Sequence, residues 1–471
     1  MRLRDLVLYN PWWEDKKKGL RYLFNKSFNF SFIAHRNTLQ NVNYMIRGPR
    51  QVGKTIFLYR NIFEYLKNGI EEDKIVYISC DRLSGIKELR NIVRELVFLR
   101  GSLILFLDEV TSLRDWYKVY KEFSENEKIT CIATGSRPLE LERYGEFFPG
   151  RGVNIINFYP LSFSEFIFSI CKSLLDYEVR VDNTIFSREF YRESLLKFLD
   201  KNNIDYETIS SLFKIFNKKY PDFKSALNYT SKFFEPIYKL FNIFLGLGGY
   251  PISVEKKIFG EEQPFEIIVQ DTLGTIEKEG LDIHILNALI PILLQKLGSR
   301  ISFNKIAREI EVDVKTVIKY INVLERSFLI RVISYCNGKI RRKKEKKIYF
   351  SDPFIIRALS NYYGIKALDK SIIAENILIE EACRKVEKPF IRDYRSYLGY
   401  GKIGGKEVDL ILNFEGRSIK IELKYEEKVE DRKYLDIILT KDEMRLSRKP
   451  YFIPLPLFLL IFDFIFQGIE Y

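Results

Sequence analysis

The sequence predicts an α/β protein: a parallel sheet comes first, followed by a helical region and then a second, smaller α/β region. In the first third of the chain, five short β-branched runs alternate with longer amphipathic segments. This alternation is typical of a parallel sheet with helices on both faces. A length of 471 residues also leaves room for about three domains. The predicted strands are Asn43–Arg47, Lys74–Cys80, Leu103–Leu107, Ile129–Ala133 and Val153–Phe158, and the predicted helices include Thr55–Leu66, Ile86–Arg100 and Trp116–Ser124.

Composition excludes several classes of protein. A hydrophobic fraction of 46% with 30% charged residues is typical of globular chains and excludes wholesale disorder. Five scattered cysteines without a CxxC pair argue against a disulfide scaffold or a zinc ribbon. Residues 1–18 carry charges within every apolar run, and the apolar stretch 451–466 is interrupted by two prolines and Asp463. We therefore expect a cytoplasmic protein without a signal peptide or a membrane span.

Beyond residue 158 the pattern changes twice more. Residues 160–247 are rich in aromatic residues, with apolar residues at helical spacing and no convincing strand, and the breaker cluster Gly246–Pro251 closes them. We expect a helical lid there. Residues 282–365 predict three helices and a strand pair around Asn337-Gly338. Residues 366–471 predict a helix and further strands, so the expected domains are 1–158, 159–281, 282–365 and 366–471.

A phosphate-binding motif lies between the first predicted strand and the first predicted helix. Residues 48–55 fit the pattern GxxxxGK[ST]. Its glycines allow backbone N–H groups to surround phosphate oxygens, and the helix N-terminus adds the positive end of its dipole. We expect Lys54 to bind the β- and γ-phosphates and the Thr55 hydroxyl to bind Mg²⁺. The residues expected to contact the nucleotide are Gly48, Pro49, Arg50, Gln51, Val52, Gly53, Lys54, Thr55 and Ile56.

A second motif supports the first. The apolar run Leu103–Leu107 ends in two carboxylates, Asp108 and Glu109. We expect Asp108 to hold Mg²⁺ through water and Glu109 to orient or deprotonate the attacking water. No guanine-reading NKxD pattern follows in a suitable place, so the expected nucleotide is ATP and the expected reaction is its hydrolysis.

Together these motifs resemble the archaeal ATPases of the AAA+ and STAND-like P-loop group. The segment Ile129–Arg137 looks like the fourth strand of that family, which ends in a polar sensor. The resemblance implies that this strand lies between the two strands already described. It also implies that Thr134 or Ser136 is the sensor and that Arg137 contacts the terminal phosphate.

The resemblance extends over roughly residues 40 to 251. Pro149-Gly-Arg151 and the segment 159–166 match the entry into the helical lid of the family. Gly249-Tyr-Pro251 is similar to the lid Gly-x-Pro that abuts the adenine, which places Pro251 at the nucleotide. Either Arg137 or Arg151 would complete the ATPase site, within one chain or across a subunit boundary of a homo-oligomer. The indoles in Asn10-Pro-Trp-Trp13 could stack on the adenine or could cover the edge of the core, and the two alternatives stay open.

The segment 302–324 predicts a helix-turn-helix, with Ser302 and Asp313 as N-caps. Two strands and a basic wing follow it, so we expect a winged helix. Between residues 296 and 350 there are 15 Lys and Arg residues against five acidic ones, which is most of the net charge of +13 of the whole chain. This concentration favours DNA, bound mainly through its phosphates, although a winged helix can also be purely structural. The expected DNA contacts are Lys315, Thr316, Lys319, Arg341, Arg342, Lys343 and Lys344.

The tail resembles a restriction-endonuclease-like module that often follows this kind of ATPase. Asp409 lies on one predicted strand, and Glu422-x-Lys424 lies on the next. The PD-(D/E)xK arrangement implies that the two carboxylates bind Mg²⁺ and that Lys424 polarises water or phosphate. Glu375 or Glu381 on the preceding helix could complete the site. Because Val408 precedes Asp409, the leading Pro-Asp is absent, and of the two alternatives we favour a fold kept without cleavage.

Three hypotheses for the function follow from these patterns. The leading one is an ATP-binding and ATP-hydrolysing protein that acts as an ATP-dependent switch at DNA. The first alternative is a STAND-like signalling or scaffold ATPase whose winged helix is structural. The second alternative is an ATP-regulated, metal-dependent nuclease. None of the three includes a membrane partner.

Overall fold

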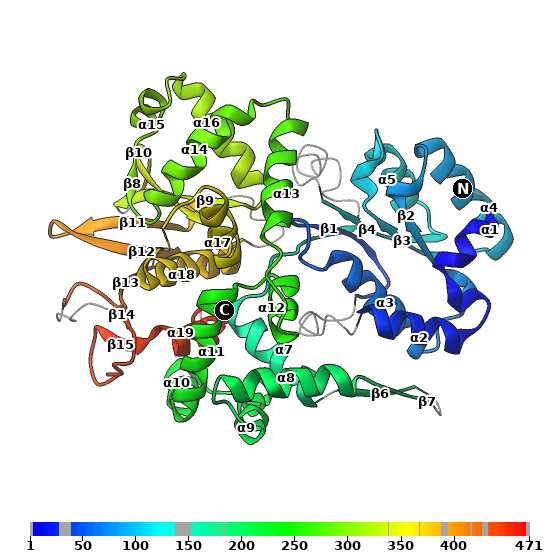
Figure 1. Cartoon of the computed structure of the whole chain (residues 1–471), viewed down its shortest axis with the longest axis horizontal. Helices are drawn as coiled ribbons and strands as arrows, with labels where there is room; N and C mark the ends of the chain where they lie inside the picture. The colour runs from blue at the N-terminus through cyan, green and yellow to red at the C-terminus, as the bar shows by residue number, and fades with distance from the viewer. Residues whose placement is uncertain are drawn as a thin grey trace. The chain divides into compact units, whose positions relative to one another are not determined.

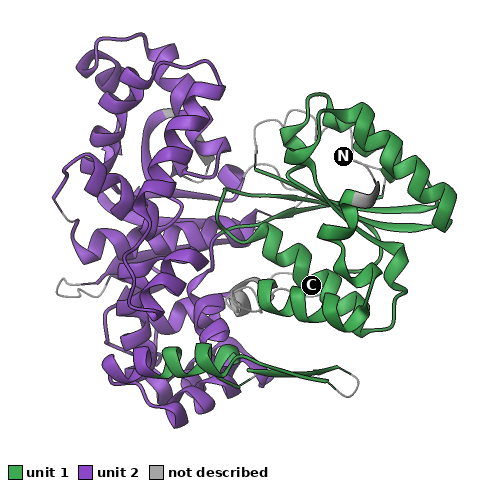
Figure 2. Cartoon of the chain, turned by 45° about the vertical axis from the view of Figure 1, so that its right-hand side comes forward, with its two compact units in different colours: residues 1–159, 172–196 green, residues 160–171, 197–471 purple. Residues whose placement is uncertain are grey.

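A computed structural model of the chain describes residues 3–27, 39–136, 152–175, 177–181, 184–337, 339–366, 368–387, 394–414, 417–425 and 432–467 (Figure 1). Contacts group the chain into two compact units (Figure 2). The first unit comprises residues 1–159 and 172–196, and the second comprises residues 160–171 and 197–471. The boundary after residue 159 lies one residue from the end of the first predicted domain.

The first unit contains a five-stranded parallel sheet in the order β2-β3-β4-β1-β5. All five strands were predicted at these positions to within two residues, and β4 lies between β1 and β3, as the family resemblance implied. Every residue of β3 is buried, which is typical of a parallel strand covered on both faces. The strands are β1 Asn43–Arg47, β2 Ile75–Ser79, β3 Leu103–Asp108, β4 Ile129–Gly135 and β5 Val153–Asn157. The main helices are α2 Lys16–Ser27, α3 Lys54–Lys67, α4 Ile86–Arg100 and α5 Trp116–Ser124.

The N-terminal segment covers the edge strand β2. The indole N–H groups of Trp12 and Trp13 both donate to the carbonyl of Ile75, at 3.0 and 2.9 Å. The side-chain amide of Asn10 exchanges two hydrogen bonds with the backbone of Tyr77, at 3.0 and 2.7 Å. These side chains form hydrogen bonds with backbone groups that could otherwise pair with another strand at an exposed sheet edge. Of the two alternatives for the tryptophan pair, the structure therefore shows the one at the core edge.

A hairpin interrupts the region that was predicted to be helical throughout. Strands β6 Glu178–Val181 and β7 Thr184–Ser187 pair in antiparallel fashion. Phe186 packs against Phe24 and Phe63 of the first unit, with ring centroids 5.4 and 6.2 Å apart. The prediction of no strand here was wrong because two runs of four residues are too short to show a period of two against their helical surroundings. The helices of this region are α7 Phe163–Leu175, α8 Glu189–Lys201, α9 Tyr206–Asn217, α10 Phe223–Thr230, α11 Phe234–Leu247, α12 Pro251–Ile258 and α13 Phe265–Lys278.

The second unit is built on an eight-stranded mixed sheet in the order β15-β14-β13-β12-β11-β9-β10-β8. Strands β9 and β11 join in parallel at Tyr335 and Tyr400, so the domain boundary expected at residue 365 runs through one continuous sheet. Glycine permits this junction, because a Cβ at Gly399 would lie 2.7 Å from the carbonyl oxygen of Ser334. The strands are β8 Arg300–Ile301, β9 Ile330–Asn337, β10 Lys339–Phe350, β11 Leu398–Ile403, β12 Lys406–Phe414, β13 Arg417–Lys424, β14 Ile437–Thr440 and β15 Tyr451–Pro454.

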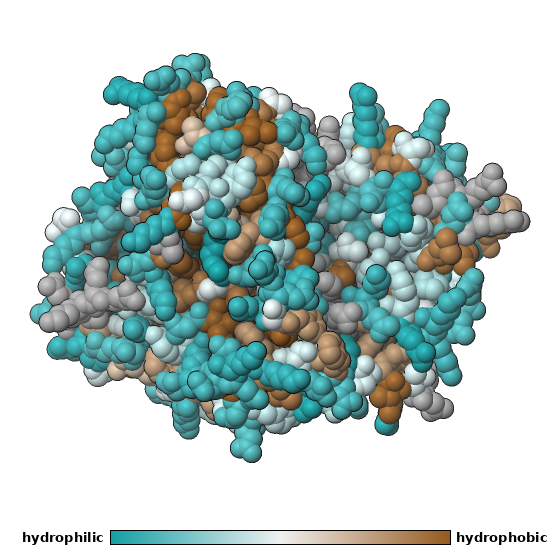
Figure 3. All heavy atoms as spheres, in the orientation of Figure 1, coloured by the Kyte–Doolittle hydropathy of each residue, from teal (hydrophilic) through white to brown (hydrophobic). Residues whose placement is uncertain are grey.

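Six further helices accompany this sheet. Ser302 and Asp313 occupy the N-cap positions of α15 and α16, but neither side chain makes a capping hydrogen bond. Of the residues that the structure describes, no helix is both long and apolar enough to cross a membrane. Hydrophilic residues predominate on the face drawn in Figure 3. The helices are α14 Ile283–Gln295, α15 Phe303–Glu309, α16 Val314–Arg326, α17 Pro353–Tyr362, α18 Lys370–Val386 and α19 Leu455–Gln467.

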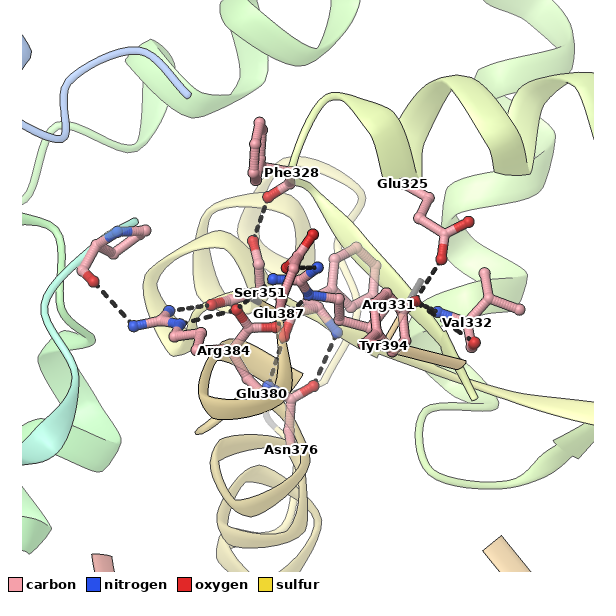
Figure 4. Close-up of polar contacts among 12 residues, drawn as sticks. Glu325, Phe328, Arg331, Val332, Ser351, Asn376, Glu380, Arg384, Glu387 and Tyr394 are labelled. Carbon is pink, nitrogen blue, oxygen red and sulfur yellow. Dashed lines mark hydrogen bonds and ion pairs between the residues drawn. The ribbon is translucent and has the colours of Figure 1, made fainter. Parts of the chain in front are cut away.

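A buried ionic network attaches α18 to the sheet (Figure 4). Arg331 of β9 donates to Glu380 at 2.9 Å and to Glu387 at 2.8 Å. Arg384 donates to the other oxygen of Glu380 at 2.8 Å and to the carbonyl of Ser351 at 3.0 Å. Burial acts to lower the pKa of Arg384, but the charges of Glu380 and Glu381 outweigh it and raise that pKa. Removing one member would leave an uncompensated buried charge, so the network fixes the helix in place.

The breaker cluster that follows α11 is held by one carboxylate. Asp352 accepts hydrogen bonds from the N–H groups of Gly249 and Phe354, both at 2.8 Å, and burial raises its pKa to about 7. The N–H of Leu161 donates to the carbonyl of Gly249 at 2.7 Å. A Cβ at Gly249 would lie 1.9 Å from the carbonyl oxygen of Leu161. Only glycine fits this close approach.

We predict that Gly249→Ala lowers the free energy of unfolding by about 1–3 kcal/mol, the usual cost of overpacking, because backbone atoms must move apart. Gly246→Ala is the matched control, since a Cβ at this position of α11 meets no atom within 4 Å. Alanine in a helix interior is favoured over glycine by about 0.5–1 kcal/mol. Urea unfolding of both variants measures the difference. Equal midpoints would show that the contact with Leu161 is not tight.

Candidate functional site

The loop at residues 48–53 joins β1 to α3 and depends on its glycines. A Cβ at Gly48 would lie 2.0 Å from the carbonyl oxygen of Phe158. Gly53, the N-cap of α3, has a φ of 90°, a backbone angle that residues other than glycine rarely adopt. The ammonium of Lys54 donates to the carbonyls of Gly48 and Pro49 at 3.0 and 2.6 Å. The motif therefore forms a tight loop over which its lysine folds back, at the N-terminus of a fourteen-residue helix.

The carboxylate of Asp108, at the end of β3, collects three hydroxyl groups from three other elements. Thr55 of α3 donates to Oδ2 at 2.7 Å, Tyr77 of β2 donates to Oδ2 at 2.9 Å, and Thr134 of β4 donates to Oδ1 at 2.6 Å. Burial raises the pKa of Asp108, and the hydrogen bonds from Thr134 and Thr55 act in the opposite direction. A hydroxyl and a carboxylate side by side are oxygen donors of the kind that hold Mg²⁺ together with nucleotide phosphates. The residues present therefore fit this metal.

Glu109 is held in a strained conformation beside Asp108. Its φ of 52° and ψ of 42° lie in the left-handed region, which costs a residue with a Cβ about 1–2 kcal/mol. The N–H of Glu109 donates to the Thr134 hydroxyl at 3.1 Å, and its carboxylate accepts hydrogen bonds from the N–H and the hydroxyl of Ser136. Strain of this kind is concentrated at functional sites. The two sensor candidates thus have different contacts, because Thr134 links Asp108 to the backbone of Glu109 while Ser136 binds the Glu109 side chain.

The structure brings Lys54, Thr55, Asp108, Glu109 and Ser136 to the carboxyl edge of one parallel sheet. Arg137 and Arg151 lie outside the described residues, and Pro251 is the first residue of α12 in the second unit. Sequence reasoning missed Tyr77. Its contact with Asp108 depends on the pairing of β2 with β3, which no local pattern reveals.

The residues of the expected nuclease-like site also come together. Asp409 on β12 and Glu422 on β13 lie on neighbouring antiparallel strands. Burial is the main cause of the raised pKa of Glu375 and of Glu422, and the charge of Asp409 is the second cause for both. Lys424 lies 3.3 Å from Glu422. Glu381 is not part of this group, because its carboxylate accepts a hydrogen bond from the N–H of Phe163 at 2.9 Å.

Two residues that the sequence did not indicate also belong to this group. Lys347 of β10 lies 3.1 Å from Glu375, 2.8 Å from Glu407 and 3.6 Å from Asp409. Glu407 precedes Asp409 by two residues on β12 and could have been found from the period of two along a strand. Lys347 comes from a distant strand and carries no such signal. Among the described residues, no three Asp, Glu, His or Cys side chains are arranged to hold a metal ion.

The expected DNA-binding residues lie on α16 and β10. Lys315 and Lys319 are exposed and Thr316 is half-buried, whereas Val317 and Ile321 of the same helix are buried. Lys344 is exposed, and the side chains of Arg341, Arg342 and Lys343 lie outside the described part of the chain. The register of β9 with β10 shifts between Arg341 and Lys346. Residues 342–345, which are three basic residues followed by Glu345, therefore form a bulge in the strand pair.

Comparison with known families finds a match for the part of the chain that contains the first of these sites. Residues 40–167 match the family described as AAA domain. This part of the chain is therefore similar to AAA domains, and the match together with the parallel sheet supports the predicted P-loop fold. Residues 239–366 match a family described only as a domain of unknown function.

Relatives of similar length are found in archaea and in bacteria. An uncharacterized protein of Methanocaldococcus jannaschii is 25% identical over 444 residues, which is 88% of this chain and 84% of the relative. An uncharacterized protein of Haemophilus influenzae is 23% identical over 399 residues, covering 81% of this chain and 82% of the relative. The archaeal origin therefore stays a prediction. AMPPCP-bound DnaA from Aquifex aeolicus is 19% identical, with 65% of this chain and 88% of that chain covered, but its TM-score of 0.23 carries no conclusion.

We predict that Thr134→Val destabilises the protein by about 1–3 kcal/mol, the cost of leaving a buried polar group unpaired, because Asp108 and the N–H of Glu109 both lose a partner. Thr130→Val is the matched control, since Thr130 lies on the same strand and makes no side-chain hydrogen bond to the described residues. The free energy of unfolding in urea is the measurement. If both variants lose the same amount, Thr134 does not stabilise the two carboxylate residues.

Proposed function

We propose that this protein binds ATP with Mg²⁺ in its AAA-type domain and hydrolyses it. The observation that carries the proposal is the pair Asp108 and Glu109, which the Thr134 hydroxyl joins at the carboxyl end of β3. Asp108 contacts the hydroxyl of Thr55 directly, so the end of β3 and the start of α3 meet where a Mg²⁺–nucleotide complex needs oxygen ligands.

Each residue has a role in this proposal. The N–H groups of the loop and the ammonium of Lys54 bind the phosphates, and Thr55 and Asp108 hold Mg²⁺. The metal neutralises charge on the β- and γ-phosphates when it is bound. Glu109 orients the attacking water and accepts its proton, and Ser136 positions the Glu109 carboxylate. Arg137 or Arg151 supplies the remaining positive charge.

The roles of Lys54 and Glu109 predict different defects. Lys54→Ala should abolish tight ATP binding, because its ammonium contacts the phosphates of bound ATP. Glu109→Gln should keep ATP binding and lower the hydrolysis rate by about 100-fold or more, the usual contribution of a general base. Binding of a fluorescent ATP analogue and release of phosphate measure the two properties separately.

Lys67→Ala, at the far end of α3, and Glu127→Gln, at an exposed position, are matched controls that should behave as wild type. Normal turnover by Glu109→Gln would reject the assignment of Glu109 as the base.

We further propose that the ATPase acts as a switch at DNA and that α14, α15, α16, β9 and β10 form a winged helix. The exposed ammonium groups of Lys315 and Lys319 on the outer face of α16 and the basic bulge of β10 support this proposal. Most of the excess positive charge of the chain lies in this segment, as DNA-binding modules require. The alternative is a scaffold ATPase whose winged helix only supports neighbouring elements.

Replacing Arg341, Arg342, Lys343 and Lys344 with Ala should weaken DNA binding and flatten its salt dependence by about 0.9 unit of log–log slope per lost phosphate contact. The control replaces Lys16, Lys17, Lys18 and Arg21 of α2 with Ala, which removes the same charge elsewhere. Fluorescence anisotropy of labelled duplex DNA over a range of salt concentrations measures both quantities. An equal effect of the two sets would favour the scaffold alternative.

A further inference from the structure

Four carboxylates of the second unit, Glu375, Glu407, Asp409 and Glu422, form what we call the tail cluster. Lys347 enters it with only 3% of its side chain exposed. Its ammonium lies 3.1 Å from an oxygen of Glu375, 2.8 Å from one of Glu407 and 3.6 Å from one of Asp409. Burial acts to lower the pKa of Lys347, but the charges of Glu375, Asp409 and Glu407 outweigh it and raise that pKa. Lys347 is therefore charged at neutral pH.

The other side of the tail cluster also has cationic partners. Arg300 pairs with the second oxygen of Glu407, and Lys424 and Arg432 both pair with Glu422. With Lys347, four cations face four carboxylates, so the formal charge of the group is zero. The remaining oxygen of Asp409 accepts a hydrogen bond from the N–H of Leu423 at 3.0 Å.

We propose that the ammonium of Lys347 is the permanent counter-ion of the tail cluster and takes the position that a divalent metal would need. Mg²⁺ requires several oxygen ligands at about 2.1 Å around one point. Here the point that oxygens of Glu375, Glu407 and Asp409 surround is occupied by the nitrogen of Lys347. The residues present do not fit the metal of a PD-(D/E)xK site. The tail of the native protein is thus a nuclease-like arrangement closed by its own lysine.

The position of Lys347 in the sheet explains why the counter-ion is permanent. Its backbone pairs with Ile333 of β9 on one side and with Arg300 of β8 on the other. The backbone of a strand paired at both edges cannot move away without breaking two ladders of hydrogen bonds, and the side chain of Lys347 is buried between its carboxylate partners. Tyr349, two residues further on the same face, donates to Glu375 at 2.5 Å and holds that carboxylate toward Lys347.

The test is Mn²⁺ binding to the full-length, nucleotide-free protein, followed by electron paramagnetic resonance. Wild type and Asp409→Asn should bind Mn²⁺ identically, because the cluster holds no metal in either. Lys347→Met removes the ammonium, leaves three carboxylates without it, and should gain one site at least ten-fold tighter than any in wild type. The double variant Lys347→Met with Asp409→Asn should lose that gained site.

Lys346→Met is the matched control, because Lys346 is the neighbouring residue of β10 and donates to Ser334 on the other side of the strand. It should gain no Mn²⁺ site, and neither should Lys347→Arg, which keeps the charge. A wild-type Mn²⁺ site that Asp409→Asn abolishes would overturn the proposal, as would a folded Lys347→Met protein, judged by circular dichroism, that gains no site. If Lys347→Met does not fold, the comparison of Mn²⁺ binding by wild type and by Asp409→Asn still tests the proposal. Because nucleotide is absent, none of these outcomes depends on the ATPase proposal.

Discussion

The first unit depends on the burial of one carboxylate. Asp108 is 3% exposed, and a buried carboxylate is stable only when hydrogen bonds replace its lost water. The three hydroxyls that supply them come from α3, β2 and β4, so the same bonds that satisfy the carboxylate also fix the start of α3 relative to the sheet. The loop, the strained Glu109 and the end of β4 are all positioned from this point.

The second unit meets the same requirement with charge instead of hydroxyl groups. Arg331 of β9 and Arg384 of α18 share Glu380, and Lys347 lies among three acids of the tail cluster. The first group connects β9 to α18, and the second connects β10 to α18 and β12. Strands β9 and β10 precede the expected boundary at residue 365, whereas α18 and β12 follow it. Buried ion pairs are weak evidence for stability but costly to break singly. They explain why strands expected in two domains form one sheet.

The sequence predicted what local patterns determine. The apolar run of β3 is followed directly by its two acids, and the last glycine of the loop is followed directly by Lys54. Each motif is a short continuous segment, so the sequence alone shows it. Tyr77 was missed because its contact with Asp108 depends on the pairing of β2 with β3. Lys347 was missed because its partners Glu375 and Asp409 lie on α18 and β12, far away in the sequence. The basic run of β10 predicts a solvated strand, but Lys347 is buried and only the part before it, which includes Lys344, is exposed. The hairpin of β6 and β7 was missed because Phe186 packs on helices from the start of the chain.

The partners of the carboxylates distinguish a site that can receive a cation from one that already contains it. Among the described residues, Asp108 and Glu109 are contacted by hydroxyl and amide donors only, from Thr55, Tyr77, Thr134 and Ser136. Neutral donors orient a carboxylate without cancelling its charge, so the negative potential persists for a metal bound with a nucleotide. The acids of the tail cluster have ammonium or guanidinium partners within ion-pair distance, and their charge is cancelled inside the fold. Both groups are clusters of acidic residues at strands, and the charge of their neighbours is the difference on which we base the two proposals, a nucleotide-bound metal at the first and a structural ion cluster at the second.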